Sequence, residues 1–422
     1  MPLPVFSRLT GLRAGLYPVI EHNPFGESRL MIRKLRIRNF LSVKEAEIEL
    51  KPRTVLVGPN MSGKTNLIAC LRFLTSLTVG PDASGRSGLQ QALFNLGGVR
   101  ELTWKGSNDP TFEIGIIADA LSPGEGRLKT YEYEISIAGS FEHQQVVIAR
   151  ESLIVQSDSE RRTLFELKAG EGTWYWRNSD GPLRVMPFQS AFEGINLVDF
   201  EGTGFRNLLA SWRFYDLVPL LMRQENPPTP QRFLQEHGEN FSAWLFTLQR
   251  YPEEFLHLKQ AALDVLPSLS EILFEPTQTA SISLGSLEDH LSRPVGIKQM
   301  SNGELAFLAL VSLIMAPDEL AVPLYCVEEP ESHLHPHLLE SLVELLNQRQ
   351  QELGARAAQI LVTTHSPQLV DWMHIDDLVV VQKVDGETRF VHPSSDQHLR
   401  DLVSNRESGL GELWFSGALD RS

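Results

Sequence analysis

The sequence predicts a mixed α/β fold whose sheet core carries an antiparallel β subdomain and a helical insertion. Apolar residues alternate strongly from Ile32 to Val57, period-two runs fill 111–185, and an α/β pattern returns after Met300. Between them, 227–274 has helical spacing after a proline-rich stretch that cannot continue a helix or central strand. The expected parts are an irregular arm at 1–30, a first lobe at 31–224, a helical insertion at 225–290 and a second lobe at 291–422.

Length and composition indicate an ordinary folded protein with more than one lobe. The 422 residues exceed the size at which a single core stops growing, and 42% of them are hydrophobic. The net charge of −15 disfavours a surface that binds phosphate backbones throughout. Cys70 and Cys326 lie in apolar runs, which suits buried thiols and the cytoplasm. No apolar run is long enough for a membrane span, so we expect no membrane partner.

The regular elements alternate in the order that a sheet with covering helices requires. The alternating residues up to Val57 predict strands, the last of which runs directly into a glycine-rich loop. The segments expected after it are a helix at 66–77, an antiparallel sheet within 111–185, a helix at 304–315, a strand at 323–327, a helix at 336–352 and a strand at 359–363.

The glycine-rich loop is the most specific motif. Gly58 to Thr65 fits G-x-x-x-x-G-K-[ST], in which backbone N–H groups wrap phosphates at the start of a helix. Lys64 is expected to reach the β- and γ-phosphates, and Thr65 to hold Mg²⁺. A glycine turn with an incidental lysine is the plainer alternative, which the preceding strand disfavours. The residues expected to contact the nucleotide here are Gly58, Pro59, Asn60, Met61, Ser62, Gly63, Lys64, Thr65 and Asn66.

Two further apolar strands end in residues that suit nucleotide hydrolysis. The first ends in Glu328 and Glu329, which we expect to complete the Mg²⁺ shell and to polarise the attacking water. A surface turn is the alternative for this fragment alone. The second strand delivers His365, whose neutral imidazole can donate a hydrogen bond to phosphate and accept one from water. Taken singly, His365 could equally be a polar loop residue.

A serine precedes the apolar helix of the second lobe. Ser301 and Glu304 have the spacing of a capping box, which alone would account for them. A serine with free N–H groups at a helix start is also a site for anions, so both interpretations are compatible. The residues at such an anion site would be Ser301, Asn302, Gly303 and Glu304.

These four motifs, in this order, resemble the ATPase heads of the ABC superfamily, of the SMC, RecF and OLD-like type. The similarity covers 31–77 and 298–370, and the strand ending at Glu328 is similar to a Walker B strand, although most relatives have Asp there. His237 to Phe241 and Leu410 to Leu419 look like stand-alone prokaryotic AAA-type ATPases without a TOPRIM domain. The resemblance implies a P-loop NTPase head of ABC type, with ATP and Mg²⁺ as ligands and catalytic roles for Lys64, Glu329 and His365.

The resemblance also implies a mechanism and partners. Two heads would form a homodimer with ATP bound between them, in which each Ser301 completes the nucleotide site of the other head. This dimer would regulate a DNA-related process or a separate effector protein, which could be a nuclease, a TOPRIM-like protein or a toxin. A glutamine is expected at the Mg²⁺ site, with Gln90 and Gln91 as candidates. A transporter subunit is the alternative, disfavoured by the Ser301 segment and the long insertions. A self-contained nuclease is disfavoured because little chain follows His365, and a coiled-coil arm because no heptads are sustained.

Three other groups of residues invite functional interpretations that we consider weaker. Alternating basic residues near the start leave DNA contact open, but usually mark a solvated strand face. Three histidines after Pro330 more simply form a loop entering a helix than a metal site. Three tryptophans are expected to pack rather than to stack on bases. These groups are Arg29, Arg33, Lys34, Arg36, Arg38, Lys51 and Arg53; His333, His335 and His337; and Trp174, Trp176 and Trp212.

Overall fold

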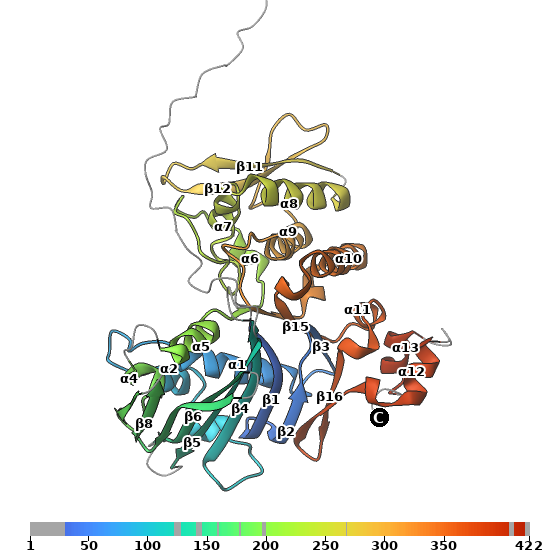
Figure 1. The fold of residues 1–422 in the computed structure, drawn as a ribbon. Helices are drawn as coiled ribbons and strands as arrows, with labels where there is room; N and C mark the ends of the chain where they lie inside the picture. The colour runs from blue at the N-terminus through green and yellow to red at the C-terminus, as the bar shows by residue number, and fades with distance from the viewer. Residues whose placement is uncertain are drawn as a thin grey trace, which may run out of the picture.

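The computed structural model describes residues 30–121, 128–140, 146–157, 160–176, 179–195, 200–266, 268–404 and 409–417. The expected arm at 1–30 lies outside these residues except for Leu30. The described strands form three sheets. Figure 1 shows two of them in the lower half of the molecule and the third at the top, above a layer of helices. None of the described helices has the length and apolar character to cross a membrane.

The largest sheet is the antiparallel subdomain expected from the alternating sequence. Its inward residues are apolar, as Leu35, Ile37 and Ile114 illustrate. Ile32 and Leu35 are an odd number of residues apart yet both buried, because a bulge between Ile32 and Lys34 restores the alternation. In spatial order its strands are β2 (Val43–Glu49), β1 (Leu30–Phe40), β4 (Thr111–Leu121), β5 (Leu128–Gly139), β6 (Val146–Ser157), β7 (Glu160–Lys168), β8 (Glu171–Trp176) and β9 (Ser179–Arg184).

The second sheet is the mostly parallel core. Its first five strands are parallel, and only β17 is antiparallel to its neighbour. The strands predicted at 323–327 and 359–363 are both present. In spatial order the strands are β10 (Arg213–Tyr215), β14 (Leu324–Glu328), β15 (Gln359–Thr364), β3 (Arg53–Val57), β16 (Leu378–Val384) and β17 (Glu387–Val391).

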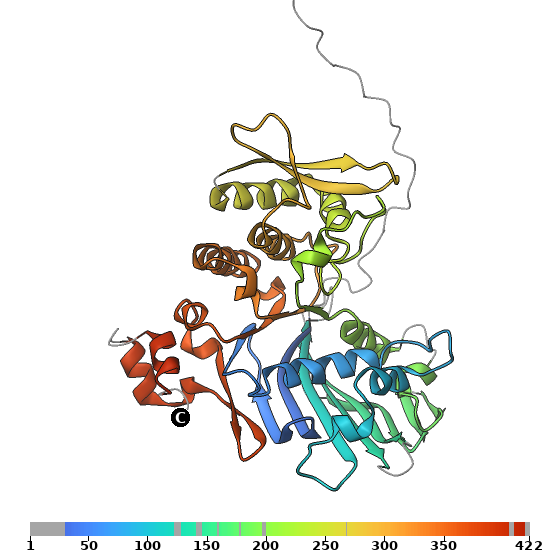
Figure 2. The ribbon, with the colours of Figure 1, turned by 180° about the vertical axis from the view of Figure 1, so that it is seen from behind.

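This parallel sheet separates two hydrophobic cores. Leu56 faces the core shared with the antiparallel sheet, while Val55 and Val57 face the core of the second lobe. In the first core, α1 (Lys64–Ser76) lies between the sheets, and Phe73 packs on Phe112 at 5.3 Å between ring centroids. Figure 2 shows this helix, in blue, lying across the antiparallel sheet. The other helices of this lobe are α2 (Gly88–Asn95), α3 (Val99–Leu102), α4 (Ala191–Gly194) and α5 (Glu201–Ala210).

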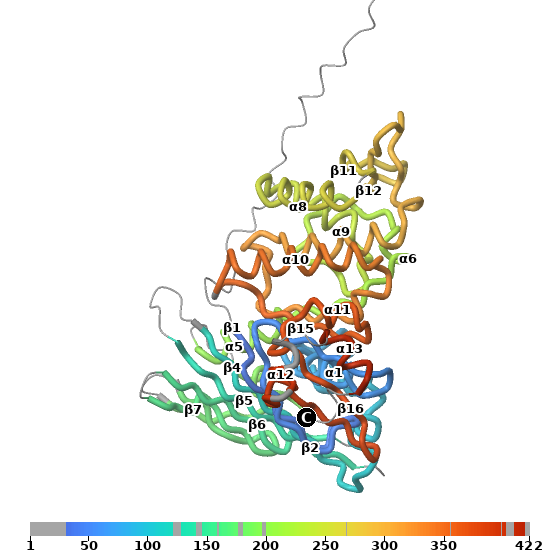
Figure 3. Tube along the Cα trace, turned by 90° about the vertical axis from the view of Figure 1, so that its right-hand side faces the viewer, coloured from blue at the N-terminus to red at the C-terminus, as the bar shows by residue number. Residues whose placement is uncertain are grey.

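Helices of the second lobe cover the opposite face of the parallel sheet. Figure 3 shows α9 (Asn302–Ile314) and α10 (Pro336–Leu353) as successive layers above β15. These two helices confirm those predicted at 304–315 and 336–352. The remaining helical elements after α9 are η1 (Pro330–His333), η2 (Gly354–Arg356), α11 (Pro367–Asp371), η3 (Ile375–Asp377), η4 (Pro393–Ser395), α12 (Gln397–Ser404) and α13 (Leu410–Phe415).

The insertion differs from the helical prediction in its second half. α6 (Pro219–Met222) precedes the insertion. Within the insertion α7 (Phe241–Leu248) and α8 (Pro252–Val265) are helical, but a small antiparallel sheet follows. The apolar run near Ile272 fits either structure locally, and it becomes a strand because it pairs with a strand further along the chain. This sheet consists of β11 (Leu269–Pro276), β12 (Ile282–Glu288) and β13 (Val295–Gly296). The expected domain limits at 224 and 290 stay predictions.

Candidate functional site

Three neighbouring parallel strands end at the same edge of the core sheet. Thr363 of β15 pairs with Glu328 of β14 and, on its other side, with Leu56 of β3. The glycine-rich loop follows β3, Glu329 follows β14, and His365 follows β15. Ligands of open α/β sheets bind at the carboxyl ends of such strands. The structure therefore brings together three of the four motifs that the sequence singled out.

The glycine-rich loop is tightly fitted against β16 and β17. A Cβ atom on Gly58 would lie 2.3 Å from the Val381 carbonyl oxygen, and one on Gly63 would lie 2.2 Å from Thr388 Oγ1. Gly63 also has a φ of +109°, which disfavours residues with a side chain. Both glycines are therefore required by the backbone. Within the loop Gly58, Ser62 and Lys64 are buried, whereas Pro59, Asn60, Met61 and Thr65 are exposed.

Lys64 lies folded beneath its own loop. Its ammonium donates to the carbonyl oxygens of Gly58, at 2.7 Å, and Pro59, at 3.1 Å. Burial lowers the pKa of Lys64, and the negative charges of Glu329 and Glu331 act in the opposite direction. The buried Ser62 hydroxyl has no hydrogen-bond partner among the described residues. A buried cation and a free hydroxyl inside a glycine cradle fit a phosphate group.

Asn66, the last of the loop residues predicted to contact the nucleotide, stabilises the loop through hydrogen bonds. Its side-chain amide donates to the Ser42 hydroxyl, which shares a 2.6 Å hydrogen bond with Thr388. Thr388 in turn donates to the Ser62 carbonyl oxygen at 2.8 Å. This network connects the loop to β17 and explains why Asn66 is half-buried.

Glu328 is mostly buried at the end of β14. Burial raises its pKa, while Arg72 and a hydrogen bond with the Thr65 side chain lower it. Arg72 lies 3.4 Å from the carboxylate, packs over the Phe214 ring and also pairs with Glu236. Thr65 and Glu328 thus lie side by side, and oxygens of these kinds are suitable ligands for Mg²⁺. The sequence did not indicate that Arg72, a residue of α1, holds the acid.

Glu329 has an unusual backbone conformation. Its φ of 41° and ψ of 57° are left-handed, and its N–H donates to the Thr363 carbonyl oxygen at 3.0 Å. Strain of this kind is frequent at functional sites. One carboxylate oxygen of Glu329 lies 3.5 Å from Nδ1 of His365, and both side chains are substantially exposed. The two residues predicted to act on water and phosphate are therefore neighbours.

Glu331 is a site residue that sequence reasoning missed. Its carboxylate lies 3.6 Å from Nδ1 of His365 but is only 9% exposed. The same carboxylate accepts hydrogen bonds from the Thr364 hydroxyl and the His365 N–H. The only signal in the sequence was a second acid shortly after Glu329, because its partners lie more than thirty residues away along the chain.

The fourth motif lies apart from the first three. Ser301 caps α9 and forms the predicted capping box with Glu304. A Cβ atom on Gly303 would lie 3.2 Å from the His333 carbonyl oxygen, so the start of α9 adjoins the turn after Glu329. Figure 1 places α9 in the upper lobe and α1 in the lower one. Ser301 and Asn302 are exposed.

The two glutamines considered for Mg²⁺ are engaged in local structure. Gln90 forms a capping box with Ser87 at the start of α2. The Gln91 amide donates to the carbonyl oxygens of Gly80 and Arg86. Both bonding patterns stabilise the entry to α2, which argues against either glutamine as a metal ligand.

The remaining groups serve structure as well. His335 caps α10, Trp212 is fully buried, Trp174 packs against the first core, and the side chain of Trp176 lies outside the described residues. The six described basic residues all pair with carboxylates, which disfavours the DNA interpretation of this face. The ion pairs are Arg33 with Asp119, Lys34 with Glu47 and Glu49, Arg36 with Glu47 and Glu134, Arg38 with Glu113, Lys51 with Asp376, and Arg53 with Asp377. Arg29 lies outside the described residues.

Comparisons with known proteins agree with this geometry. The Old nuclease of Escherichia phage P2 is 22% identical over 380 residues, covering 82% of this chain and 58% of the phage protein. This chain thus spans little more than half of that relative. Among solved structures, an Smc head bound to the C-winged helix domain of ScpA matches with a TM-score of 0.51 and 16% identity, over 85% of this chain and 96% of that one.

The Smc match shows the fold alone, which is that of an Smc head. A family model matches residues 53–371, from the start of β3 to the end of α11. The match therefore covers the three strands that precede the glycine loop, Glu329 and His365, and also the capping-box helix α9. The chain belongs to the family described as "AAA domain, putative AbiEii toxin, Type IV TA system".

Proposed function

We propose that this chain binds and hydrolyses ATP, dimerises around the nucleotide and thereby switches a partner protein. The observation that carries the proposal is the convergence of the glycine loop, the two acids and His365 at one edge of the core sheet. Lys64 and the backbone N–H groups of the loop hold the β- and γ-phosphates, since both are hydrogen-bond donors and the Lys64 ammonium lies beneath the loop. Each of these groups suits phosphoryl transfer to water.

One acid would hold the metal ion, and another would orient the attacking water. Thr65 and Glu328 are the residues that would hold Mg²⁺, an ion that neutralises phosphate charge when bound. Glu329 accepts a hydrogen bond from the attacking water and orients it, while His365 donates to the γ-phosphate. Water adds to the γ-phosphorus as the bond to the β-phosphate oxygen breaks, giving ADP and phosphate. Arg72 supports the longer Glu328 in place of the usual Asp.

The exposed start of α9 supports a dimeric site. Ser301 and Asn302 face solvent in the upper lobe, while the glycine loop lies in the lower lobe. A helix start with a serine and free N–H groups is suited to a phosphate, and here the second copy of the chain would supply that phosphate. Two heads arranged head to tail would place residues 301–304 of each against the nucleotide of the other.

The relatives favour a separate effector protein as the partner. The phage relative is named a nuclease, so we propose that the partner that this chain switches is a nuclease or toxin. The Smc head was solved with part of another protein, ScpA, bound to it. Because the basic residues of β1 pair with acids, a protein partner is better supported than direct DNA contact through that strand.

The proposal is tested by phosphate release and native mass of the wild type and Glu329→Gln, with and without Mg²⁺ and ATP. Loss of the water-orienting carboxylate should lower turnover by about 100-fold or more. The variant should accumulate as an ATP-dependent dimer of twice the monomer mass. Glu340→Gln, an exposed acid on α10, is the matched control and should behave as the wild type.

Each outcome is informative. A wild type that neither binds nor hydrolyses ATP overturns the proposal. Hydrolysis without any nucleotide-dependent change of mass keeps the ATPase and overturns the dimer. Stimulation by duplex DNA, added in a parallel series, would point to DNA rather than protein as the partner.

A further inference from the structure

Glu331 occupies a place in the site that the proposed chemistry does not use. Its side chain is 9% exposed, whereas that of Glu329 is 40% exposed. One oxygen, Oε1, accepts two hydrogen bonds, and the other, Oε2, is buried with no partner among the described residues. A buried carboxylate is expensive to desolvate unless it is hydrogen-bonded. Its retention here therefore calls for a role.

The turn that carries His365 is organised around this carboxylate. Oε1 accepts from the Thr364 hydroxyl at 2.6 Å and from the His365 N–H at 3.0 Å. The Thr364 hydroxyl also accepts from the Ser366 N–H at 2.9 Å, and Ser366 caps α11 through the Leu369 N–H. All three residues of the turn are thus connected, directly or through one bond, to Glu331.

The other side of the turn is fixed to the catalytic acid. The Glu329 N–H donates to the carbonyl oxygen and, at 3.2 Å, to the hydroxyl of Thr363. His365 itself is 44% exposed, so packing contributes little to fixing its ring. The hydrogen bonds of Glu331 therefore hold the backbone from which the His365 ring extends toward Glu329.

We infer that Glu331 is a positioning residue for hydrolysis: it holds the 364–366 turn so that His365 lies against Glu329. This inference rests on the proposed ATPase function. Glu331 acts through the length of its side chain, which carries the carboxylate oxygen from η1 to the end of β15. The negative charge is secondary, because a neutral amide oxygen can also accept from the two donors.

The inference is tested by substitutions that change the length of the Glu331 side chain and its charge separately. Glu331→Gln keeps the acceptor, and Glu331→Asp keeps the charge but withdraws the oxygen by one methylene. We expect Asp and Ala to lower kcat for ATP hydrolysis by roughly 10- to 100-fold, as misplacement of catalytic groups does, with KM changed less than about twofold. Gln should stay within about threefold of the wild type. Glu340→Ala is the matched surface control.

A double-mutant cycle identifies the route of the effect. If Glu331 acts through His365, then Glu331→Ala should change kcat by less than about twofold in a His365→Ala background. An additive loss, or an active Asp variant beside an inactive Gln variant, overturns the inference alone. Absence of hydrolysis by the wild type overturns the proposed function and this inference with it. Thermal unfolding identifies any variant that fails to fold, and the Gln and Asp pair then decides.

Discussion

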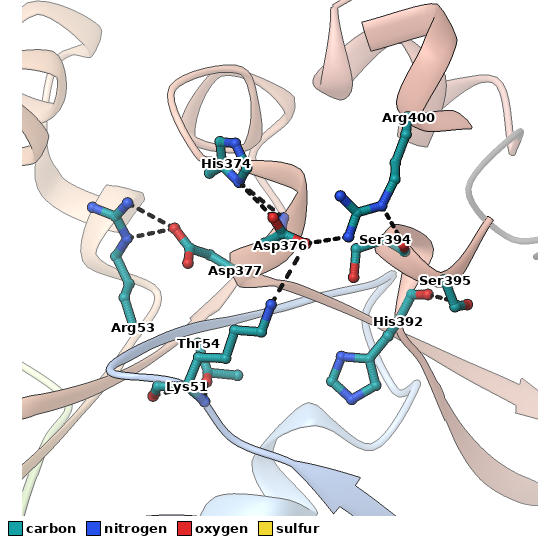
Figure 4. Close-up of polar contacts among 10 residues, drawn as sticks. All are labelled: Lys51, Arg53, Thr54, His374, Asp376, Asp377, His392, Ser394, Ser395 and Arg400. Carbon is teal, nitrogen blue, oxygen red and sulfur yellow. Dashed lines mark hydrogen bonds and ion pairs between the residues drawn. The ribbon is translucent and has the colours of Figure 1, made fainter. Parts of the chain in front are cut away.

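The two ends of the core strand β3 are built on different principles. At its start, Arg53 forms an ion pair with Asp377 at 2.6 Å and contacts Asn347 of α10. Beside it, Asp376 pairs with Lys51, His374 and Arg400, as Figure 4 shows. Burial raises the pKa of Asp376, but these three neighbours outweigh it and hold the pKa below its usual value.

At the end of β3, by contrast, polar groups are left available. The Ser62 hydroxyl and one oxygen of Glu331 are buried without partners in the described part of the chain. Burial raises the pKa of Glu328, and Glu329 has a left-handed backbone. Paired charges stabilise the fold, whereas unpaired groups and strain are retained where a ligand would compensate them. One end of the strand therefore serves stability, and the other is the proposed binding site.

The largest effect that we expect concerns the binding end. Lys64→Met keeps the volume of the side chain but removes the buried cation, so turnover at saturating ATP should fall by about 100-fold or more. The melting temperature should change little, because the hydrogen bonds of the lysine ammonium to the described residues go to carbonyl oxygens of its own loop. Phosphate release measures the turnover, and thermal unfolding measures the melting temperature. Lys168→Met, at an exposed position of β7, is the control. A large loss of stability would remove the contrast between the two ends.

The next effect concerns the stabilising end. Arg53→Met leaves Asp377 without its cation, and since both side chains are only 15% exposed the free energy of unfolding should fall by about 2 kcal/mol. Turnover per folded molecule should be unchanged. Arg38→Met breaks an exposed pair with Glu113 and should cost less than about 0.5 kcal/mol. Urea unfolding compares the two variants, and equal losses would contradict the argument from burial.

The smallest effect concerns a residue at the stabilising end that is an exception, because its polar group is not paired with any described residue. His392 lies near the start of β3, and its buried Nε2 has no partner within the described residues. Burial and Lys51 lower its pKa from 6.5, and Glu49 opposes them. The unfolded chain therefore binds this proton at higher pH than the folded chain, so stability falls as the pH drops below about 6.5. In His392→Gln, urea unfolding at pH 8 and pH 5.5 should show a smaller fall; an equal fall would contradict the role of His392.

The sequence predicted the local parts of the site well. The glycine loop, Glu329 and His365 each follow a strand that its own residues specify, and the structure places them at one edge. Capping at Ser301 was also correct. Such features depend on backbone geometry within a few residues, which a contiguous pattern can encode. Their functional roles stay predictions until turnover is measured.

Other parts could not be predicted because their partners are distant along the chain. The β11 and β12 hairpin depends on cross-strand pairing, and the basic residues of β1 are neutralised by acids of β2 and β4. Neither feature has a local signature, since an apolar run fits helix or strand and a charged strand face can be free or paired.

The sequence by itself therefore determined the motifs and their order, because each motif consists of consecutive residues. Only the tertiary structure decided which groups support them: Arg72 beside Glu328, and Glu331 beneath His365. Hydrogen bonds and ion pairs of this kind depend on where separate strands and helices pack, and the packing of the whole core brings those side chains within a few ångströms.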